Sequence, residues 1–419
     1  MPWKETHVEA ERRRFVEEYF AVGRRWSMTE LCEAFGVSRK TGYKWIGRFQ
    51  QGGVAELEDR SRARHTQAEA TEATIEEALV ATRRKHANWG PRKLLGYLER
   101  RNPDVQWPAP STVGGILKRR GLVKPSRRRR RGVRPDAIEL REVAAANEVW
   151  AVDFKGWFRT GDGQRCDPLT ITDVHSRYLL KCQRVDQPDG ECVKPVFEKV
   201  FAEFGLPVAI RSDNGAPFAS RGAGGLTRLS AWWVKLGIEL ERIMPGCPQQ
   251  NGRHERMHRT LKRETARPPA ANGRAQQRRF NRFQRSFNWE RPHEALGNDC
   301  PADHYDVSPR PYPVTVPEIE YPAYVERRQI RTSGEIKWRG QLLYVTQALV
   351  GELVGIEEID DDKWLVRFGP IPLALVDSYD NRILHYRPRG SEHHRADAHA
   401  AVDNSGRPTG SLRHPQPQE

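Results

Sequence analysis

The chain has 419 residues and a formal net charge of +15. The excess of Lys and Arg lies in its first third: residues 1–136 hold 30 Lys and Arg against 17 Asp and Glu, whereas the remainder holds 40 against 38. The six cysteines form no C-x-x-C pair, which argues against a structural zinc module or a disulfide framework, and no apolar run is long enough to span a membrane. This pattern predicts a soluble intracellular protein of about three domains that binds a polyanion such as nucleic acid.

The first helical set, residues 1–60, predicts a helix-turn-helix DNA-binding domain. The stretch Ser27–Glu30 is a capping box that starts a short helix, and Ser38 caps the helix that follows. We expect the inward side of that last helix to carry Tyr43 and Ile46. Its outer side is basic, and the expected DNA contacts are Arg39, Lys40, Lys44 and Arg48. The alternative is a three-helix scaffold with a solvated basic face.

Residues 68–124 predict a second helical, helix-turn-helix-like DNA-binding module, although Gly114 and Gly115 weaken its last helix. Its polar face is again basic, and the expected DNA contacts are Arg92, Lys93 and Lys118. A basic linker, residues 125–147, follows with five consecutive arginines that repel one another and cannot pack. We expect this run to lie extended along phosphates through Arg128, Arg129 and Arg130.

Residues 148–306 predict a mixed α/β domain. The segments EVWAVDFKGWFR, PLTITDVH and RYLLKCQRVD alternate like three antiparallel strands, and strands and helices then alternate along the chain. The short β runs within residues 320–387 suit a small β-barrel, and the tail 388–419 lacks apolar content and is expected to be disordered. The fold class is therefore multidomain: all-α helix-turn-helix modules, a central α/β domain, a small β-barrel and a disordered tail.

Three acidic residues of the α/β domain form a candidate metal site. Asp153 stands within the apolar strand WAVDF, Asp213 ends the strand VAIRSDNG, and Glu255 follows PQQNG at the start of a long helix. Taken singly, Asp153 is better explained as a surface residue of an edge strand, and Asp213 as an ordinary turn aspartate. A carboxylate among apolar neighbours is costly unless a cation neutralises it, and three that converge form an all-oxygen site suited to Mg²⁺ or Mn²⁺.

These residues and their flanks resemble the integrase-core (D,D,E) transposases of bacterial insertion sequences, on the retroviral integrase and RNase H-like fold. The matching segments, in chain order, are WAVDFKGWF, ITDVHSRY, IRSDNGAPF, MPGCPQQNGRHERMHRTLK and FNWERPHEALGNDCPADHY. The resemblance is close over residues 140–306. One departure is a longer interval between the second and third carboxylates, which we place in the glycine-rich insertion ASRGAGGLTRLS.

The resemblance implies a DNA transposase. Asp153, Asp213 and Glu255 would be catalytic and would hold two Mg²⁺ or Mn²⁺ ions for in-line phosphoryl transfer, which cleaves DNA at element ends and joins the 3′-OH ends to target DNA. The implied partners are the terminal inverted repeats and target DNA, bound by a homodimer or larger assembly. The implied location is the prokaryotic cytoplasm, in association with the nucleoid. The residues expected to contact DNA near the ions are Asn214, Gln249, Asn251 and Lys262.

The stretch HERMH, residues 254–258, also matches the zinc-protease pattern H-E-x-x-H. Arginines on both sides of the motif would repel Zn²⁺ and attract phosphates, and no glycine follows at the position that would turn the chain toward a third ligand. Glu255, Arg259 and Lys262 fall on one helix face at i, i+4 and i+7. We therefore expect that face to offer a metal ligand followed by two cations for a DNA backbone.

Two other functions remain open from the sequence. A catalytically inactive DNA-binding regulator would carry the same basic modules, and an RNase H-like nuclease could cut without joining. The presence of all three carboxylates favours an active enzyme, since a degenerate copy need not keep them. A strand-transfer assay separates the three.

Overall fold

The computed structural model describes residues 8–23, 26–59, 71–123, 140–244, 252–377 and 382–386. The chain divides into two compact units, Met1–Glu72 and Ala73–Glu419. The predicted disordered tail and most of the predicted basic linker lie outside the described residues. Among the helices of the described part, none is long and apolar enough to cross a bilayer.

The first unit is a small helical domain. Its elements are α1 (Val8–Phe20), α2 (Met28–Ala34), α3 (Arg39–Gly52) and the 3-10 helix η1 (Gly53–Leu57). The predicted capping box is confirmed: the Ser27 hydroxyl accepts the backbone N–H of Glu30, and the Glu30 carboxylate accepts the backbone N–H of Ser27. Ser38 caps α3 by accepting the N–H of Thr41.

The buried face of α3 differs from the one expected. Ile46 is buried as predicted, but Tyr43 is 51% exposed and Trp45 takes an inward position. Gly42 explains the change, because a Cβ there would lie 2.7 Å from the Cys32 sulfur. The missing side chain allows α2 and α3 to approach closely, which turns Tyr43 toward solvent on the basic side of the helix.

The second unit begins with another helical module. Its helices are α4 (Ala73–Lys85), α5 (Pro91–Arg101) and α6 (Pro110–Arg119). They enclose an apolar cluster that includes Leu79, Trp89, Leu94 and Ile116, each at most 2% exposed. Proline at the first position of α5 and α6 suits helix starts, because its fixed φ angle is helical and its missing N–H would be unpaired there anyway.

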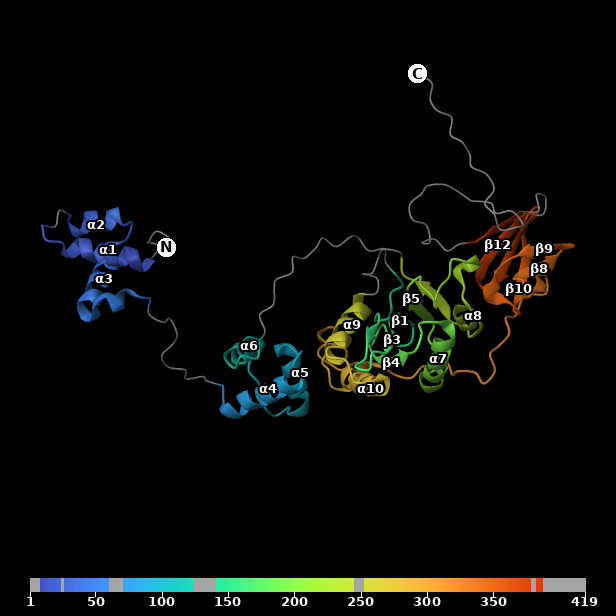
Figure 1. Cartoon of the computed structure of the whole chain (residues 1–419), viewed down its shortest axis with the longest axis horizontal. Coiled ribbons are helices and arrows are strands. Elements are labelled where there is room, and N and C mark those ends of the chain that lie inside the picture. The colour runs from blue at the N-terminus through green and yellow to red at the C-terminus, as the bar shows by residue number, and fades with distance from the viewer. Residues whose placement is uncertain are drawn as a thin grey trace, which may run out of the picture. The chain divides into compact units, whose positions relative to one another are not determined.

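A mixed sheet forms the centre of the second unit (Figure 1). Its strand order is β4–β3–β1–β5–β6, and the short β2 pairs the beginning of β3. The first three strands are antiparallel, as predicted, whereas β5 and β6 run parallel to β1. The strands are β1 (Val149–Phe154), β2 (Phe158–Arg159), β3 (Arg165–Asp173), β4 (Leu179–Val185), β5 (Ala209–Ser212) and β6 (Glu239–Arg242).

Helices cover both faces of this sheet. Trp150 and Val152 of β1 pack in a core with residues of α7 (Gly190–Phe204) and α8 (Arg228–Lys235). The opposite face packs Met257 and Leu261 of α9 (Gly252–Thr265) and phenylalanines of α10 (Gly273–Trp289) against β3 and β4. Since side chains alternate along a strand, the odd-numbered residues of β1 point toward α9.

The C-terminal strands form an open sheet, so the predicted closed barrel is not confirmed. Five strands run in the order β13–β12–β11–β10–β7, and β8 and β9 form a separate hairpin. Ile336 and Leu343 of the hairpin pack in one apolar cluster with the larger sheet, so burial is achieved without closure between β7 and β13. The strands are β7 (Glu326–Gln329), β8 (Glu335–Trp338), β9 (Gln341–Tyr344), β10 (Leu353–Asp360), β11 (Lys363–Phe368), β12 (Ile371–Asp377) and β13 (Arg382–His385).

The glycine-rich insertion docks this C-terminal sheet onto the central domain. It folds into the 3-10 helix η2 (Ala223–Gly225), which is buried. Gly224 has a φ of +62°, and its N–H donates to the carbonyl of Tyr386. Ala223 and Leu226 join the apolar cluster of the C-terminal sheet. The segment that departs from the family pattern therefore forms part of an internal interface.

Candidate active site

Asp153 lies near the end of β1, on the face that α9 covers. It stands opposite Thr170 of β3 in the strand register, and its side chain is 25% exposed. Burial, and after it the negative charge of Asp213, raises the pKa of Asp153 to about 7. A carboxyl group held in this way is poised to bind a cation, which would remove the cost of its charged form.

Asp213 follows β5 directly. Because β5 pairs in parallel with β1, their carboxyl ends share one edge of the sheet, where α/β proteins place their sites. Burial raises the pKa of Asp213 as well, although the backbone N–H of Gly215 donates to its Oδ1 at 3.2 Å and acts in the opposite direction. The two aspartates therefore lie at the same edge of the sheet, near enough for the charge of Asp213 to act on Asp153.

Glu255 lies in the first turn of α9. Its negative charge also raises the pKa of Asp153, so the third carboxylate is within electrostatic reach of the first. Its side chain lines a hollow of about 280 Å³. The other described residues that line this hollow are cations: Lys155, Arg259, Lys262, Arg263 and Arg267.

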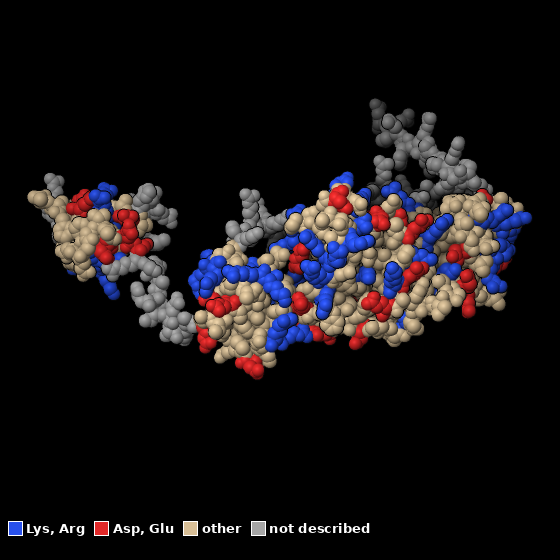
Figure 2. All heavy atoms as spheres, turned by 60° about the horizontal axis from the view of Figure 1, so that its bottom comes forward, with Lys and Arg blue, Asp and Glu red and all other residues tan. Residues whose placement is uncertain are grey.

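The donor set suits a hard divalent cation. Three carboxylates offer oxygen atoms alone, which is the ligand type that Mg²⁺ and Mn²⁺ prefer. Asp153 and Asp213 are both destabilised in their charged forms, and a bound cation would reverse that effect. The cations of the adjoining hollow suit the negative charge of a phosphodiester, which would be bound by them and by the metal ion together. On the face shown in Figure 2, Lys and Arg gather densely over the end of the central domain that carries α9 and α10.

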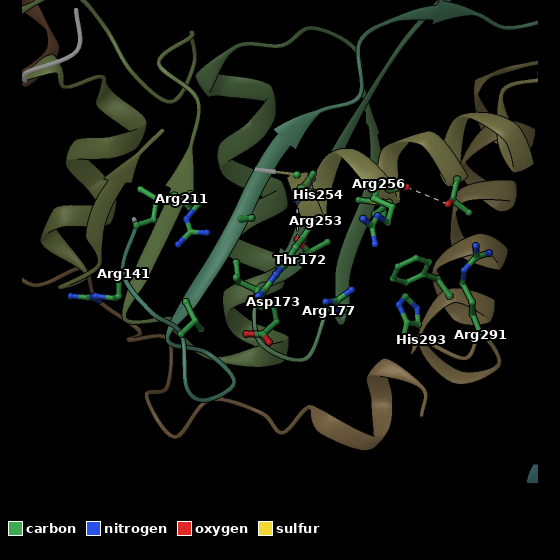
Figure 3. Close-up of a pocket in the computed structure, with 18 of the residues that line it drawn as sticks. Arg141, Thr172, Asp173, Arg177, Arg211, Arg253, His254, Arg256, Arg291 and His293 are labelled. Carbon is green, nitrogen blue, oxygen red and sulfur yellow. Dashed lines mark hydrogen bonds between the residues drawn. The ribbon is translucent and has the colours of Figure 1, made fainter. Parts of the chain in front are cut away.

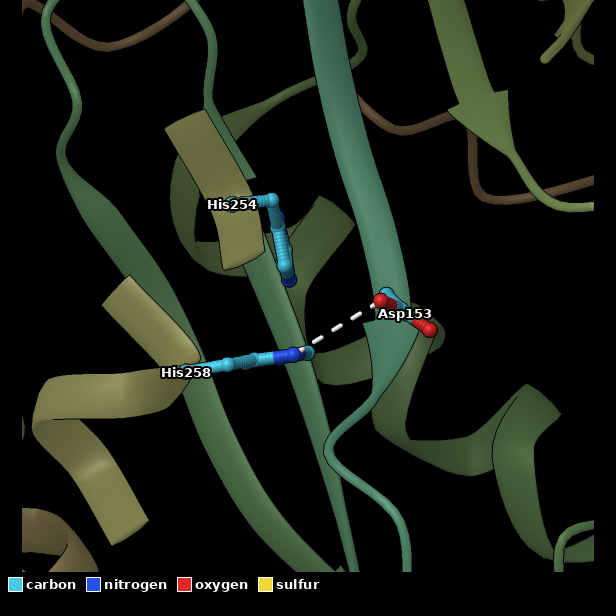
Figure 4. Close-up of side chains that lie close together, drawn as sticks. All are labelled: Asp153, His254 and His258. Atoms are coloured by element: carbon cyan, nitrogen blue, oxygen red, sulfur yellow. Dashed lines mark ion pairs between the residues drawn. The ribbon is translucent and has the colours of Figure 1, made fainter. Parts of the chain in front are cut away.

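The two histidines of HERMH point from α9 into the protein, and the His258 ring points toward Asp153 (Figure 4). His254 and His258 are 2% and 5% exposed. One possible ligand atom from each of Asp153, His254 and His258 lies within 4.8 Å of the others, so their spacing alone would permit a metal ion. However, the Nε2 atoms of His254 and His258 already contact the Thr170 hydroxyl oxygen, at 2.7 and 2.6 Å.

A count of protons explains this network. The Thr170 hydroxyl donates its single proton to the backbone carbonyl of Asp153 at 3.0 Å, so both imidazoles must donate from Nε2 to the same oxygen. The Nδ1 of His254 then accepts from the Thr172 hydroxyl at 2.9 Å. Burial lowers the pKa of both histidines, which keeps them neutral. The histidines are thus satisfied by threonines, and this supports the choice of the carboxylates over a zinc-protease site.

Thr170, Lys155 and His258 were not among the residues expected at the site from the sequence. His258 Nδ1 lies 3.6 Å from Asp153 Oδ2. Lys155 follows Asp153 at i+2, and this spacing along a strand was the available signal that it would face the same way. Thr170 could be found only from the strand register, which brings positions 153 and 170 together.

The residues expected to contact DNA near the carboxylates fall into three groups: some line the hollow, one makes a hydrogen bond within the protein, and others lie outside the described residues. Arg259 and Lys262 line the hollow beside Glu255, on one face of α9 as predicted. The Asn214 amide instead donates to the carbonyl of Ile243 at 2.7 Å, which ties the turn after β5 to the end of β6. Five of the expected contacts lie outside the described residues: Arg128, Arg129, Arg130, Gln249 and Asn251.

The helical modules present their basic residues in two ways. On α3, Arg39, Lys40 and Lys44 are exposed and Arg48 is partly buried. On α5, Arg92 pairs with Glu294 at 3.3 Å and the Lys93 ammonium donates to the Pro292 carbonyl at 2.6 Å. These two residues of the second module therefore contact the central domain, whereas Lys118 of α6 is exposed.

Comparisons with known proteins identify the same parts of the chain. Family models described as an integrase core domain match residues 143–248 and 236–301. Models described as a helix-turn-helix domain and a homeodomain-like domain match residues 11–65 and 41–117. The predicted helix-turn-helix and integrase-core parts of the fold are thereby confirmed.

Two curated relatives come from bacterial insertion elements. An uncharacterized 31.7 kDa protein of insertion element IS407 from Burkholderia multivorans is 26% identical over 229 residues, covering 54% of this chain and 78% of the relative. An uncharacterized 39.2 kDa protein of insertion element IS476 from Xanthomonas euvesicatoria is 27% identical over 227 residues, covering 54% of this chain and 62% of the relative.

Among solved structures, the HTLV-2 integrase catalytic core domain in complex with magnesium is similar at 13% identity and a TM-score of 0.30, covering 38% of this chain and 97% of that one. The integrase-core and helix-turn-helix matches and the insertion-element relatives together support an insertion-sequence transposase of the retroviral integrase and RNase H-like superfamily.

Proposed function

We propose that the chain is a DNA transposase that cleaves DNA at the ends of its element and joins the freed 3′-OH ends to target DNA. One observation carries this proposal: the negative charges of Asp213 and Glu255 both act on Asp153, beside a hollow lined by cations. Carboxylates that destabilise one another next to phosphate-binding groups are the pattern expected of a metal-dependent phosphoryl-transfer site.

Asp153, Asp213 and Glu255 would hold the divalent cations, two per site. When bound, these ions supply charge neutralisation at the scissile phosphate and lower the pKa of the attacking water or 3′-hydroxyl. The remaining work belongs to the protein. Arg259 and Lys262 bind the DNA backbone beside Glu255. The Thr170 hydroxyl donates to the main-chain carbonyl of Asp153 and so holds the protein main chain in place there. Catalysis then consists of positioning and charge neutralisation, with no covalent intermediate on the enzyme.

The helical modules would recognise the DNA. The exposed basic side of α3 suits the major groove and would read the terminal inverted repeats, with Arg39, Lys40 and Lys44 at the DNA. Because two element ends must be brought together, we propose a homodimer or larger assembly on DNA. The relatives from bacterial insertion elements support action in the prokaryotic cytoplasm, at the nucleoid.

A strand-transfer assay with labelled DNA from the ends of the element tests this function. We expect wild-type protein with Mg²⁺ to nick the labelled end and join it to a target plasmid. Glu255→Gln should abolish both steps while binding to the element end stays within about twofold, because the substitution removes a metal ligand and leaves α3 intact. Glu264→Gln, in the same helix but paired with Arg291, is the matched control and should keep activity.

The outcomes separate the alternatives. A wild-type protein that binds without cutting would be a regulator, and one that cuts without joining would be a nuclease. Cutting by Glu255→Gln at the wild-type rate would refute the site assignment.

A further inference from the structure

A second basic cavity lies on the other flank of α9. It has a volume of about 670 Å³ and opens between α5, the turn from β3 to β4, the beginning of α9 and the segment after α10 (Figure 3). Arg253, Arg256 and Thr260 line it. At 100° per residue these positions lie on the side of the helix opposite to Glu255 and Lys262, so the cavity is separate from the hollow beside the carboxylates.

Part of the positive charge that lines the cavity has no acidic partner among the described residues. Three of its arginines have acidic partners: Arg141 with Glu239, Arg211 with Glu241 and Arg291 with Glu264. Four further cations line it without an acidic partner in the described part of the chain: Lys93, Arg177, Arg253 and Arg256. The buried acid of the lining, Asp173, already accepts three hydrogen bonds from Asn147 and Ser176.

Burial and neighbouring charges destabilise the charged forms of two of these cations, Lys93 and Arg177. Burial, and then the charges of Arg291, Arg177 and Arg256, lowers the pKa of Lys93 to about 8, although Glu294 acts in the opposite direction. Burial and the charges of Arg253 and Arg256 likewise lower the pKa of Arg177. Gathering cations from three segments without an acidic partner among the described residues costs free energy, and an anion bound among them would reverse that cost.

His293 supplies an independent sign of a missing partner. Its side chain is 9% exposed and lines the cavity, yet its Nε2 has no hydrogen-bond partner among the described residues. Burial and the charge of Lys93 lower the pKa of His293 to about 3, so the ring is neutral and carries one N–H. Buried polar atoms are nearly always hydrogen-bonded, so the unpartnered Nε2 of His293 indicates a missing ligand.

We propose that this cavity binds a phosphate group, held by Lys93, Arg177, Arg256 and the His293 ring. The beginning of α9, a helix of 14 residues, adds the positive end of its dipole on the same side. Guanidinium groups match phosphate oxygens by paired hydrogen bonds. Two acids line the cavity among the described residues: Asp173 is held by its own hydrogen bonds, and Glu142 is exposed to solvent.

Binding there would join two parts of the second unit. Lys93 belongs to α5, whereas Arg177 and Arg256 belong to the central domain. Helix α5 contacts the segment after α10 directly through the ion pairs of Arg92 with Glu294 and of Arg100 with Asp303, and through Gly96, which lies close to Pro292. A phosphate bridging Lys93 to the other cations would hold the second helical module against the core.

Titration calorimetry with inorganic pyrophosphate, in EDTA so that metal-bound pyrophosphate at the carboxylates is excluded, tests the proposal. We expect wild-type protein to bind and Arg256→Gln to bind about tenfold more weakly, since one charge-assisted hydrogen-bonding group is lost. Arg278→Gln, an exposed charge change on α10, is the matched control and should bind within about twofold of wild type.

A nuclear magnetic resonance measurement adds a readout at the site. The His293 ring signal, assigned by its absence in His293→Gln, should shift when pyrophosphate is added. Competition identifies the source of the phosphate: a short single-stranded oligonucleotide that displaces pyrophosphate in an Arg256-dependent way points to the DNA backbone, whereas no displacement points to a free phosphate compound. Equal weakening by Arg256→Gln and Arg278→Gln, or an unmoved His293 signal, would overturn the proposal, and either result leaves the transposase assay unaffected.

Discussion

Asp153 makes the metal-free protein sensitive to pH. Its carboxyl has a pKa of about 7 when folded against an ordinary value of 3.8, so between these values the folded state holds a proton that the unfolded state has released. The contribution of Asp153 to the free energy of unfolding therefore falls as pH rises from about 4 to about 7. Because Mg²⁺ binds the deprotonated form, we predict that Mg²⁺ affinity rises by up to about tenfold per pH unit below pH 7 and levels off above it.

Calorimetric titration of Mg²⁺ across that range checks this prediction. Thermal unfolding in EDTA at a series of pH values gives a second readout. The stability of Asp153→Asn should depend less on pH between about 4 and about 7 than that of the wild type, because the titrating carboxyl is gone. A wild-type Mg²⁺ affinity that stays constant from about pH 5.5 to about pH 8 would contradict it.

Thr170 satisfies three buried groups with one hydroxyl: the Asp153 carbonyl and the Nε2 atoms of His254 and His258. Thr170→Val keeps the shape and leaves all three unpaired, at about 1–3 kcal/mol for each buried group that finds no other partner. We predict a loss of at least about 3 kcal/mol in the free energy of unfolding, measured by urea denaturation. Thr172→Val, which removes one partner of His254, should cost about 1 kcal/mol. Equal losses would show that the shared hydroxyl has no special role.

At the scale of elements, alternation and capping signals predicted the segments that depend on local sequence. The capping box Ser27–Glu30 and the three antiparallel strands are present because side chains two to four residues apart decide them. Packing between elements was beyond such signals. The missing side chain of Gly42 allows a close helix contact that leaves Tyr43 exposed to solvent. The hairpin of β8 and β9 packs against the C-terminal sheet, which stays open instead of closing into the predicted barrel.

The site could be predicted in part for the same reason. Asp153 could be singled out because a charge within an apolar strand is visible in sequence, but the three carboxylates were grouped through the resemblance to the integrase-core transposases. The helix face that carries Glu255, Arg259 and Lys262 followed from helical spacing. The partners of His254 and the contact of Lys93 with Pro292 depend on segments about 80 and 200 residues away, and no local pattern records them.

The insertion η2 should be sensitive to a single methyl group. A Cβ at Gly224 would lie 2.9 Å from Leu373 Cδ2 and 3.0 Å from Ile371 Cγ2, and φ is +62°. We predict that Gly224→Ala lowers the free energy of unfolding by about 2 kcal/mol through backbone strain and overpacking. Hydrogen exchange should also rise in β12, which η2 contacts. Gly222→Ala, at a φ of −73° and with its nearest contact at 3.4 Å, is the matched control and should be nearly neutral.

For the whole molecule, the excess positive charge lies in the part that we propose recognises DNA. The first 136 residues carry a net charge of +13 and the rest +2, so binding to DNA should depend mainly on the basic first third. Lys40 and Lys44 are exposed on α3, where they can release counter-ions from DNA phosphates. We predict that the double variant Lys40→Gln, Lys44→Gln flattens the slope of log K against log salt by about two units.

Fluorescence anisotropy with element-end DNA at several salt concentrations measures this slope. The matched control is Arg13→Gln with Glu17→Gln, which removes an exposed ion pair on α1 without changing the net charge and should keep the wild-type slope. At DNA concentrations that saturate the double variant, Mg²⁺-dependent cleavage should recover, because the carboxylates lie in the other unit. An unchanged slope would place the DNA contacts of the first unit elsewhere than α3, and cleavage that fails to recover at saturation would show that α3 also takes part in the chemical step.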